Sequence, residues 1–175
     1  GREATAGELE AARRATGAYA WEVDPAGRRG RHGSGVRLDA GGFGKGAGLR
    51  GAAFALEETD LYWAILDFGG QLLLWARDAS SRWLIAAADP RDRGRPALRL
   101  EVGPGSIATS GASERYVDTP AGRVGHLIDP RSARPVPAWG SVTVVADDPL
   151  AADVLSTALF VAGPERALAL AREHG

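Results

Sequence analysis

The sequence predicts a single domain of the α+β class, with a mainly antiparallel sheet and flanking helices. The chain has 175 residues, 45% hydrophobic and 25% charged, which is the size and balance of an ordinary globular domain. Between residues 62 and 109, short apolar runs follow one another with turn signals between them, as in a meander rather than in repeated βαβ units. Two helical patterns then close the chain.

The first part of the chain is expected to hold two helices and two short strands. Good helix formers over residues 6–16 end at a glycine, which suits a helix C-terminus. Alternation over residues 19–23 predicts a strand, and the polar, glycine-rich residues 28–35 predict a loop. A strand over residues 36–39 leads into a helix that ends at about Glu58.

The centre and the C-terminal part supply the sheet. The expected strands cover residues 62–67, 71–77, 83–88, 97–102, 106–109 and 122–128. The prolines of residues 131–139 oppose regular structure, and the β-rich run at 141–146 predicts a strand in the middle of the sheet. Helices are expected over residues 150–161 and 164–173, with Gly163 and Pro164 between them.

Composition excludes several classes of function. The net charge is −1 and no basic run is present, so nothing indicates a nucleic-acid partner. Without cysteine, the chain has no disulfide, thiolate metal site or cysteine nucleophile. No apolar run approaches the roughly 20 residues of a membrane-spanning helix. The chain starts without methionine or an apolar signal segment, so we expect its N-terminus to be processed or cut from something longer.

Asp153 and Thr157 are candidates for a metal site. At positions i and i+4 of a helix they share one face, and their hard oxygen atoms suit Mg²⁺ or Ca²⁺. The competing interpretation is structural. An acidic residue near a helix start interacts favourably with the helix dipole, and a threonine within a helix often bonds to its own backbone.

Two further segments carry small or hydroxyl residues suited to a phosphate group. Residues 39–46 (DAGGFGKG) follow an expected strand and open a helix, where glycines and free N–H groups let a phosphate approach. Thr109 and Ser110 could donate hydrogen bonds to a phosphate or ribose. Without further context, an ordinary strand-to-helix turn is the better explanation of residues 39–46, and Thr109 and Ser110 could merely cap or turn the chain. A hairpin turn is a sufficient explanation of the Gly69-Gly70 pair between two strands.

His126 is a candidate general base because histidine titrates near neutral pH. A lone histidine before a turn is also a common structural hydrogen-bonding residue. No serine–histidine–acid order accompanies it, so the residues alone do not establish catalysis.

In combination and in order, these segments resemble the ApbE family of flavin transferases. Residues 39–46 resemble the family's D-L-G-G-I-A-K-G, and Gly69-Gly70 its N-x-G-G-D. Residues 108–111 (ATSG) with Arg115 resemble A-T-S-G followed by an arginine. Residues 126–132 (HLIDPRS) are similar to H-I-I-D-P-R-T-G, and residues 141–160 to S-V-T-V-x-A…A-D-x-L-A-T-A-L-F. The resemblance covers about residue 36 to the C-terminus, with a fainter similarity at residues 8–23.

The resemblance implies a Mg²⁺-dependent enzyme that cleaves FAD and transfers FMN to a Thr or Ser of a partner flavoprotein, releasing AMP. It implies that Asp153, Thr157 and a main-chain carbonyl near Gly42 hold the metal. It makes His126 the candidate for activating the acceptor hydroxyl. The candidates for binding FAD are Lys45, Thr109, Ser110 and Asp39. Family members often work in the periplasm or at a membrane, so such a location is expected here.

The chain also departs from the family pattern. Gln71 replaces an expected acid, Arg50 an expected aspartate and Ala133 an expected glycine. The family's longer N-terminal portion, which helps to enclose the flavin, is not represented, so we expect a short or N-terminally truncated member. Two other functions stay open: a non-catalytic module that binds FAD or another nucleotide, and a pyrophosphatase that releases FMN and AMP without an acceptor.

Overall fold

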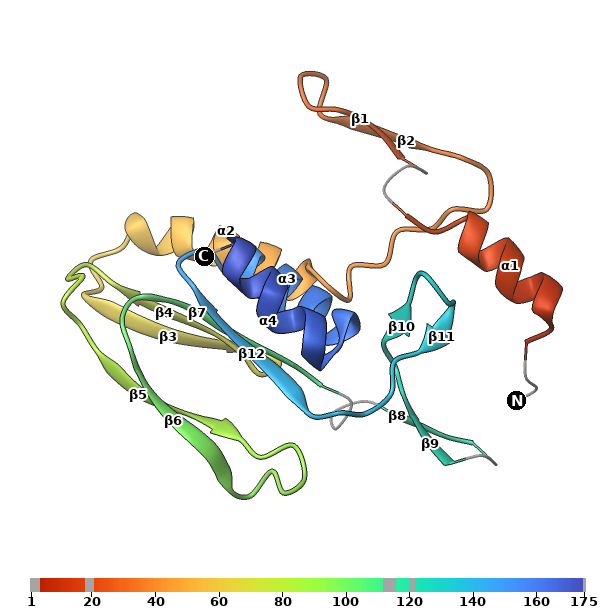
Figure 1. Ribbon diagram of the computed structural model, residues 1–175. Coiled ribbons are helices and arrows are strands. Elements are labelled where there is room, and N and C mark those ends of the chain that lie inside the picture. The colour runs from red at the N-terminus through yellow and green to blue at the C-terminus, as the bar shows by residue number, and fades with distance from the viewer. Residues whose placement is uncertain (1–3, 18–20, 112–115, 120–121, 175) are drawn as a thin grey trace.

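The computed structural model describes residues 4–17, 21–111, 116–119 and 122–174 (Figure 1). The helices are α1 (Ala6–Arg14), α2 (Gly44–Glu57), α3 (Pro149–Ala162) and α4 (Pro164–His174). The strands are β1 (Trp21–Asp24), β2 (Arg29–His32), β3 (Trp63–Phe68), β4 (Gln71–Ala76), β5 (Trp83–Ala88), β6 (Pro96–Val102), β7 (Gly105–Gly111), β8 (Tyr116–Thr119), β9 (Gly122–Gly125), β10 (Ile128–Asp129), β11 (Arg134–Pro135) and β12 (Ser141–Ala146). The predicted α+β class is confirmed. No helix in the described ranges has both the length and the apolar character needed to span a bilayer.

Four strands form the central sheet in the order β12-β7-β4-β3, and each neighbouring pair is antiparallel, as predicted. The prediction that residues 141–146 lie in the middle of the sheet is wrong. Within the described part of the chain β12 pairs with β7 alone and is an edge strand. Its apolar composition is explained by helix α3, which packs against both β7 and β12 (Figure 1). Helix α3, rather than a second neighbouring strand, partly covers Val142 and Val144, while Val145 is 50% exposed.

The sheet is covered on both faces. Leu73 and Ala108 are buried on the face that carries the helices. On the other face, Leu74 and Ile107 pack against Val102 of the β5–β6 hairpin, which forms a two-stranded sheet of its own. Burying each such aliphatic side chain contributes about 1.5–3 kcal/mol. These contacts hold the strand ends that position the candidate site.

The N-terminal elements lie away from the central sheet (Figure 1). Helix α1 begins with a capping box in which Thr5 Oγ1 accepts from the Glu8 N–H at 3.3 Å and Glu8 Oε2 accepts from the Thr5 N–H at 2.8 Å. The prediction of a loop over residues 28–35 is wrong where β2 pairs with β1. Gly27 N–H donates to Asp24 Oδ1 at 2.9 Å and closes the turn between them. Every residue of β2 is exposed, so no apolar alternation signals this strand.

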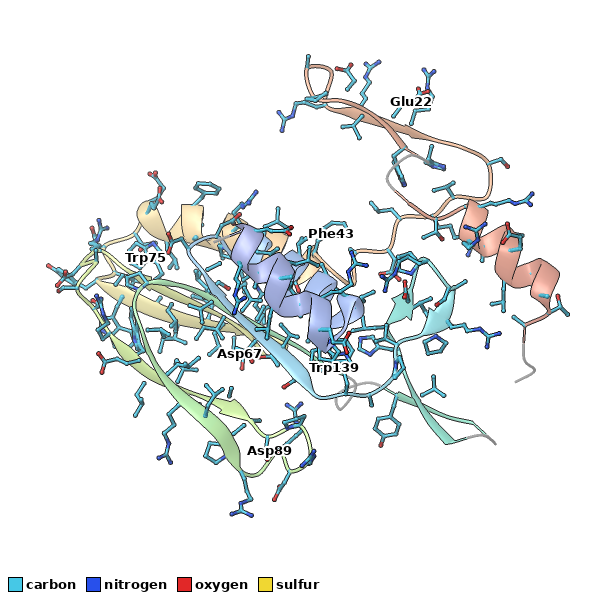
Figure 2. The ribbon with its side chains drawn as sticks, viewed as in Figure 1. Glu22, Phe43, Asp67, Trp75, Asp89 and Trp139 are labelled. Carbon is cyan, nitrogen blue, oxygen red and sulfur yellow. The ribbon has the colours of Figure 1, made fainter. Side chains whose placement is uncertain are left out.

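The strand predicted over residues 36–39 is not present; this segment is irregular. Asp39 Oδ1 accepts from the Gly41 N–H at 2.7 Å, and this local bond turns the chain toward α2. The predicted helix that follows is confirmed as α2. Figure 2 shows Phe43 immediately before its first turn.

Two small hairpins, β8–β9 and β10–β11, connect β7 to β12. The predicted strand over residues 122–128 is divided between β9 and β10, and β8 was not expected. Strand β11 occupies two positions of the segment expected to be irregular. Ala133 in the β10–β11 turn has φ of 53°, and its N–H donates to the Asp129 carbonyl at 2.8 Å.

Both C-terminal helices are confirmed near their predicted bounds. Asp148 is the N-cap of α3, and its Oδ1 accepts from the Leu150 N–H at 3.1 Å. Gly163, with φ of 87°, separates α3 from α4. Near the end of α3, the Trp139 indole stacks on Phe160 with ring centroids 5.1 Å apart, and its Nε1 donates to the Phe160 carbonyl at 3.1 Å (Figure 2).

Candidate functional site

Most of the candidate residues meet at one cavity of about 180 Å³. Its walls come from the start of α2, the β3–β4 turn, the end of β7, the loop after β9 and helix α3. The candidate residues among its lining are Lys45, Thr109, Ser110, His126 and Thr157. Segments spread over more than half of the sequence therefore contribute to a single polar space.

Asp153 lies behind this cavity and is 1% exposed. Lys45 Nζ donates to its Oδ1 at 2.9 Å, and the Gly46 N–H donates to its Oδ2 at 2.9 Å. The first turn of α2 thus supplies both partners of a buried carboxylate on α3. Pairing and hydrogen bonding of this kind offset the cost of burying a charge.

Gly46 makes this arrangement possible. A Cβ atom at this position would lie 2.7 Å from Leu150 Cα and 2.8 Å from Asp153 Cβ, and it would also collide with the Pro149 carbonyl oxygen. Only glycine lets α2 and α3 approach so closely. Gly46, the last residue of the DAGGFGKG segment, therefore has a packing role that does not depend on the ligand of the site.

Hydroxyl groups connect the end of β7 to its neighbours. Thr109 Oγ1 lies 2.9 Å from Thr143 Oγ1 on β12. Ser110 Oγ lies 3.0 Å from Ser156 Oγ and 3.2 Å from Thr157 Oγ1, both on α3. Because hydroxyls can both donate and accept, this group can reorient toward a ligand in the cavity.

Gly42 lies against Thr157, since a Cβ built on Gly42 would be 3.5 Å from Thr157 Cγ2. The structure thus brings together Thr157 and the backbone near Gly42. Asp39 is different: it is exposed, bonds to its own turn and is not part of the cavity lining. That Asp39 binds FAD stays a prediction.

His126 is exposed and lines the cavity from the loop between β9 and β10. In the same motif, Asp129 and Arg131 form an ion pair of 2.8 Å. The hydrogen bond from Arg131 holds the pKa of the Asp129 carboxyl below its ordinary value of 3.8. This pair stiffens the turn that follows His126. Arg115, part of the ATSG resemblance, lies outside the described residues.

Gln71 is a cavity residue that the sequence does not single out as a ligand. It is 1% exposed, and its Nε2 donates to the Pro149 carbonyl at 2.8 Å and to Ser106 Oγ at 3.2 Å. Its Oε1 is buried with no hydrogen-bond partner among the described protein atoms. A buried acceptor of this kind is uncommon and is available to a donor group in the cavity. In the sequence, the one sign of its importance is that Gln71 stands where the family pattern has an acidic residue.

Arg50, the second departure, pairs with Asp148 at the start of α3. Arg50 Nε donates to Asp148 Oδ1 at 2.7 Å, and a second contact joins Arg50 Nη2 to Asp148 Oδ2. The hydrogen bond from Arg50 is the main cause that lowers the pKa of Asp148 from 3.8, and the Leu150 N–H adds to it. A second link therefore joins α2 to α3 beside the Lys45–Asp153 pair.

The oxygen atoms at this site suit a hard cation. Asp153 offers a carboxylate and Thr157 a hydroxyl, the family resemblance implies a main-chain carbonyl near Gly42 as a third ligand, and Mg²⁺ commonly takes few protein ligands beside water and phosphate. No group of three or more His, Cys, Asp or Glu side chains gathers into a metal cluster in the described ranges. Lys45 already places a positive charge on Asp153 Oδ1, so a cation binding there competes with the lysine.

Comparisons with known proteins agree with the motifs. The sequence model of the ApbE family matches residues 1–175. The FAD:protein FMN transferase of Rhodobacter capsulatus is 39% identical over 131 residues, covering 74% of this chain and 25% of that protein. The enzyme of the same name from Treponema pallidum is 34% identical over 151 residues, covering 80% and 42%. This chain therefore spans less than half the length of these relatives.

Solved structures show the same fold. The ApbE protein of Thermotoga maritima superposes with a TM-score of 0.88 at 30% identity, covering 99% of this chain and 58% of that one. The apo form of the Pseudomonas stutzeri flavinyl transferase ApbE gives a TM-score of 0.79 at 30% identity, covering 99% and 54%.

Proposed function

The chain belongs to the ApbE family, and we propose that it supplies the catalytic part of a flavin transferase that moves FMN from FAD to a Thr or Ser of an acceptor flavoprotein. The observation that carries this proposal is the meeting of Lys45, Ser110, His126 and Thr157 at one cavity, backed by the buried Asp153. The Lys45 ammonium group provides positive charge, and the hydroxyls of Ser110 and Thr157 provide hydrogen-bond donors. The His126 imidazole provides the base that phosphoryl transfer requires.

The proposed reaction is a displacement at phosphorus. The acceptor hydroxyl oxygen forms a bond to the phosphorus of the FMN half, and the bond from that phosphorus to the bridging oxygen breaks. AMP leaves with the bridging oxygen, and His126 takes the proton of the acceptor hydroxyl. Lys45, Thr109 and Ser110 hold the pyrophosphate, which restricts its position relative to the incoming hydroxyl.

Asp153, Thr157 and the main chain near Gly42 would hold a Mg²⁺ ion in this proposal. When bound, the ion supplies charge neutralisation for the pyrophosphate. The support for it is the set of hard oxygen atoms at the site. For the location, family resemblance alone suggests a periplasmic or membrane-associated protein, which cell fractionation tests.

One assay tests the function and separates it from its alternatives. The purified protein is incubated with FAD and either MgCl₂ or EDTA, with and without an acceptor flavoprotein, and the products are separated by chromatography. A transferase yields AMP together with an acceptor whose mass has increased by that of FMN less one water, in Mg²⁺ only. AMP and free FMN in equal amounts without acceptor indicate a pyrophosphatase. Quenching of FAD fluorescence without AMP indicates a binding module.

A further inference from the structure

The side-chain amide of Gln71, the first residue of β4, has a fixed orientation. Its NH₂ group faces two acceptors, the Pro149 carbonyl at 2.8 Å and Ser106 Oγ at 3.2 Å. The Ser106 hydroxyl donates its own proton to the Leu72 carbonyl at 2.7 Å, so it accepts from Gln71. A flipped amide would place Oε1 against the Pro149 carbonyl, an acceptor against an acceptor. Oε1 therefore occupies the side of the amide away from these two bonds.

Gln71 Oε1 is a buried acceptor without a donor. Gln71 is 1% exposed, and within the described part of the chain no protein group donates to its Oε1. Buried polar atoms are normally hydrogen-bonded, because an unmet acceptor has lost its bond to water without replacement. In a residue that lines a cavity, such an atom indicates that a ligand supplies the donor.

Gln71 lies on the same face of the central sheet as the proposed phosphate-binding groups. Its bond to the Pro149 carbonyl places it against the start of α3, and Ser110 on β7 also bonds to α3. Lys45 lines the same cavity and passes close to the turn before Gln71, since a Cβ built on Gly69 would lie 3.9 Å from Lys45 Cδ. The Lys45 side chain is 35% exposed and can move to admit a ligand.

The pyrophosphate of FAD cannot satisfy this acceptor. Its ionised oxygen atoms are themselves acceptors and carry no proton, so the donor must be a neighbouring group of the same ligand. In FAD, the first donors on either side of the pyrophosphate are hydroxyl groups, of the ribityl chain on one side and of the ribose on the other. The N–H groups of the two ring systems lie farther out.

We propose that Gln71 Oε1 accepts a hydrogen bond from a hydroxyl of the sugar or polyol chain next to the bound pyrophosphate. This role rests on the proposed function and makes Gln71 a residue that determines specificity, because a phosphate without such a hydroxyl lacks the bond. An ionised acid at position 71 would have no proton to donate to the Pro149 carbonyl. The arrangement therefore belongs to this chain rather than to the family pattern.

NMR observes this contact directly, because Gln71 is the only glutamine of the chain and there is no asparagine. Protein carrying isotope-labelled glutamine is titrated with FAD in MgCl₂ without an acceptor protein. We expect the side-chain carbonyl carbon to shift downfield as FAD binds, because its oxygen gains a hydrogen bond. The NH₂ protons should keep their chemical shifts, because their two partners are unchanged. Separate titrations with FMN and AMP tell whether the ribityl chain or the ribose carries the donor.

Quenching of flavin fluorescence in the same samples separates the two claims. If FAD does not bind, the proposed function fails, and this role of Gln71 fails with it. If FAD binds and the Gln71 carbonyl signal does not move, the role of Gln71 is overturned while the proposed function stands. Movement of the carbonyl and NH₂ signals together also overturns it, because the whole amide has then rearranged.

Gln71→Met and Ser106→Ala form a matched pair of variants. Both remove the side-chain bond between β4 and β7, but only Gln71→Met removes Oε1. By isothermal titration calorimetry we expect Gln71→Met to weaken FAD binding about tenfold and Ser106→Ala to change it less than about twofold. Equal weakening in the two variants would show that the link between the strands matters rather than Oε1, and it would overturn the proposal. If Gln71→Met does not fold, the NMR titration of wild type still decides.

Discussion

Lys45 Nζ lies 2.9 Å from Asp153 Oδ1, joining two residues 108 positions apart in the sequence. The Asp153 side chain is 2% exposed and the Lys45 side chain 35%, so the pair lies between the protein interior and the cavity. One partner is fixed in the core, and the other can turn toward a ligand. The pair therefore links the proposed cation position to the proposed phosphate position.

Replacing Lys45 should change the affinities for cation and FAD in opposite directions. Lys45→Met removes the charge that competes for Asp153, so we expect Mg²⁺ to bind more tightly by isothermal titration calorimetry. The same change removes a charged hydrogen-bond donor and should weaken FAD binding about tenfold. Lys45→Arg keeps the charge and serves as the control. Weaker Mg²⁺ binding in Lys45→Met would show that lysine and cation do not compete.

Gly46→Ala should separate α2 from α3. Its Cβ would meet backbone atoms of Leu150, so we expect a loss of about 2–3 kcal/mol in the free energy of unfolding. Gly51→Ala lies in the same helix with nothing within 4 Å of the added Cβ, and it should stabilise by about 0.5–1 kcal/mol. Urea denaturation measures both. Equal effects at the two positions would contradict the close approach of the helices.

The Arg50–Asp148 pair should make stability depend on acid. The pKa of Asp148 is lowered in the folded state, so its contribution is present above the ordinary value of 3.8 and is lost as pH falls through the lower folded value. We expect Arg50→Ala to lower the melting temperature at pH 7 and the difference from wild type to shrink below about pH 4. The control is Arg99→Ala, because Arg99 is exposed on β6 and takes part in none of the ion pairs described in the structure. If the melting temperatures of wild type and Arg50→Ala still differed as much at pH 2.5 as at pH 7, the ion pair with Asp148 would not be the cause.

Ala133→Gly should stabilise the β10–β11 turn. Ala133 has φ of 53°, which costs a residue with a Cβ about 1–2 kcal/mol, while glycine loses about 0.5–1 kcal/mol more entropy on folding. We therefore expect a net gain of about 0.5 kcal/mol in urea denaturation. Ala138→Gly, at an exposed position without positive φ, should instead be neutral or destabilising. A larger gain in stability for Ala138→Gly than for Ala133→Gly would contradict the left-handed conformation of Ala133.

The sequence predicted the parts of the site that depend on local spacing. Asp153 and Thr157 share a helix because four residues make about one turn. The contact between Lys45 and Asp153 had no local signal, since it depends on how closely Gly46 lets two helices approach. Asp39 was predicted to bind FAD, and this stays a prediction; in the structure its side chain accepts from the Gly41 N–H of its own turn.

The errors in the fold have a similar cause. Strand β2 was missed because a fully exposed strand carries no apolar pattern. Strand β12 was expected in the middle of the sheet because five of its six residues are apolar or β-branched, yet a helix above it accounts for that composition. The apolar content of a strand predicts that it is covered by other parts of the protein. It does not predict whether a helix or a neighbouring strand covers it.

Asp153→Asn tests the central claim most directly, through the rate of AMP release from FAD. Asparagine keeps an oxygen to accept the Gly46 N–H, so a circular dichroism spectrum like that of wild type is expected. With acceptor and Mg²⁺, we predict that wild type releases AMP, that EDTA abolishes the release and that Asp153→Asn lowers it by about 100-fold or more. Release by Asp153→Asn at the wild-type rate, or no release by folded wild type in Mg²⁺, would contradict the account.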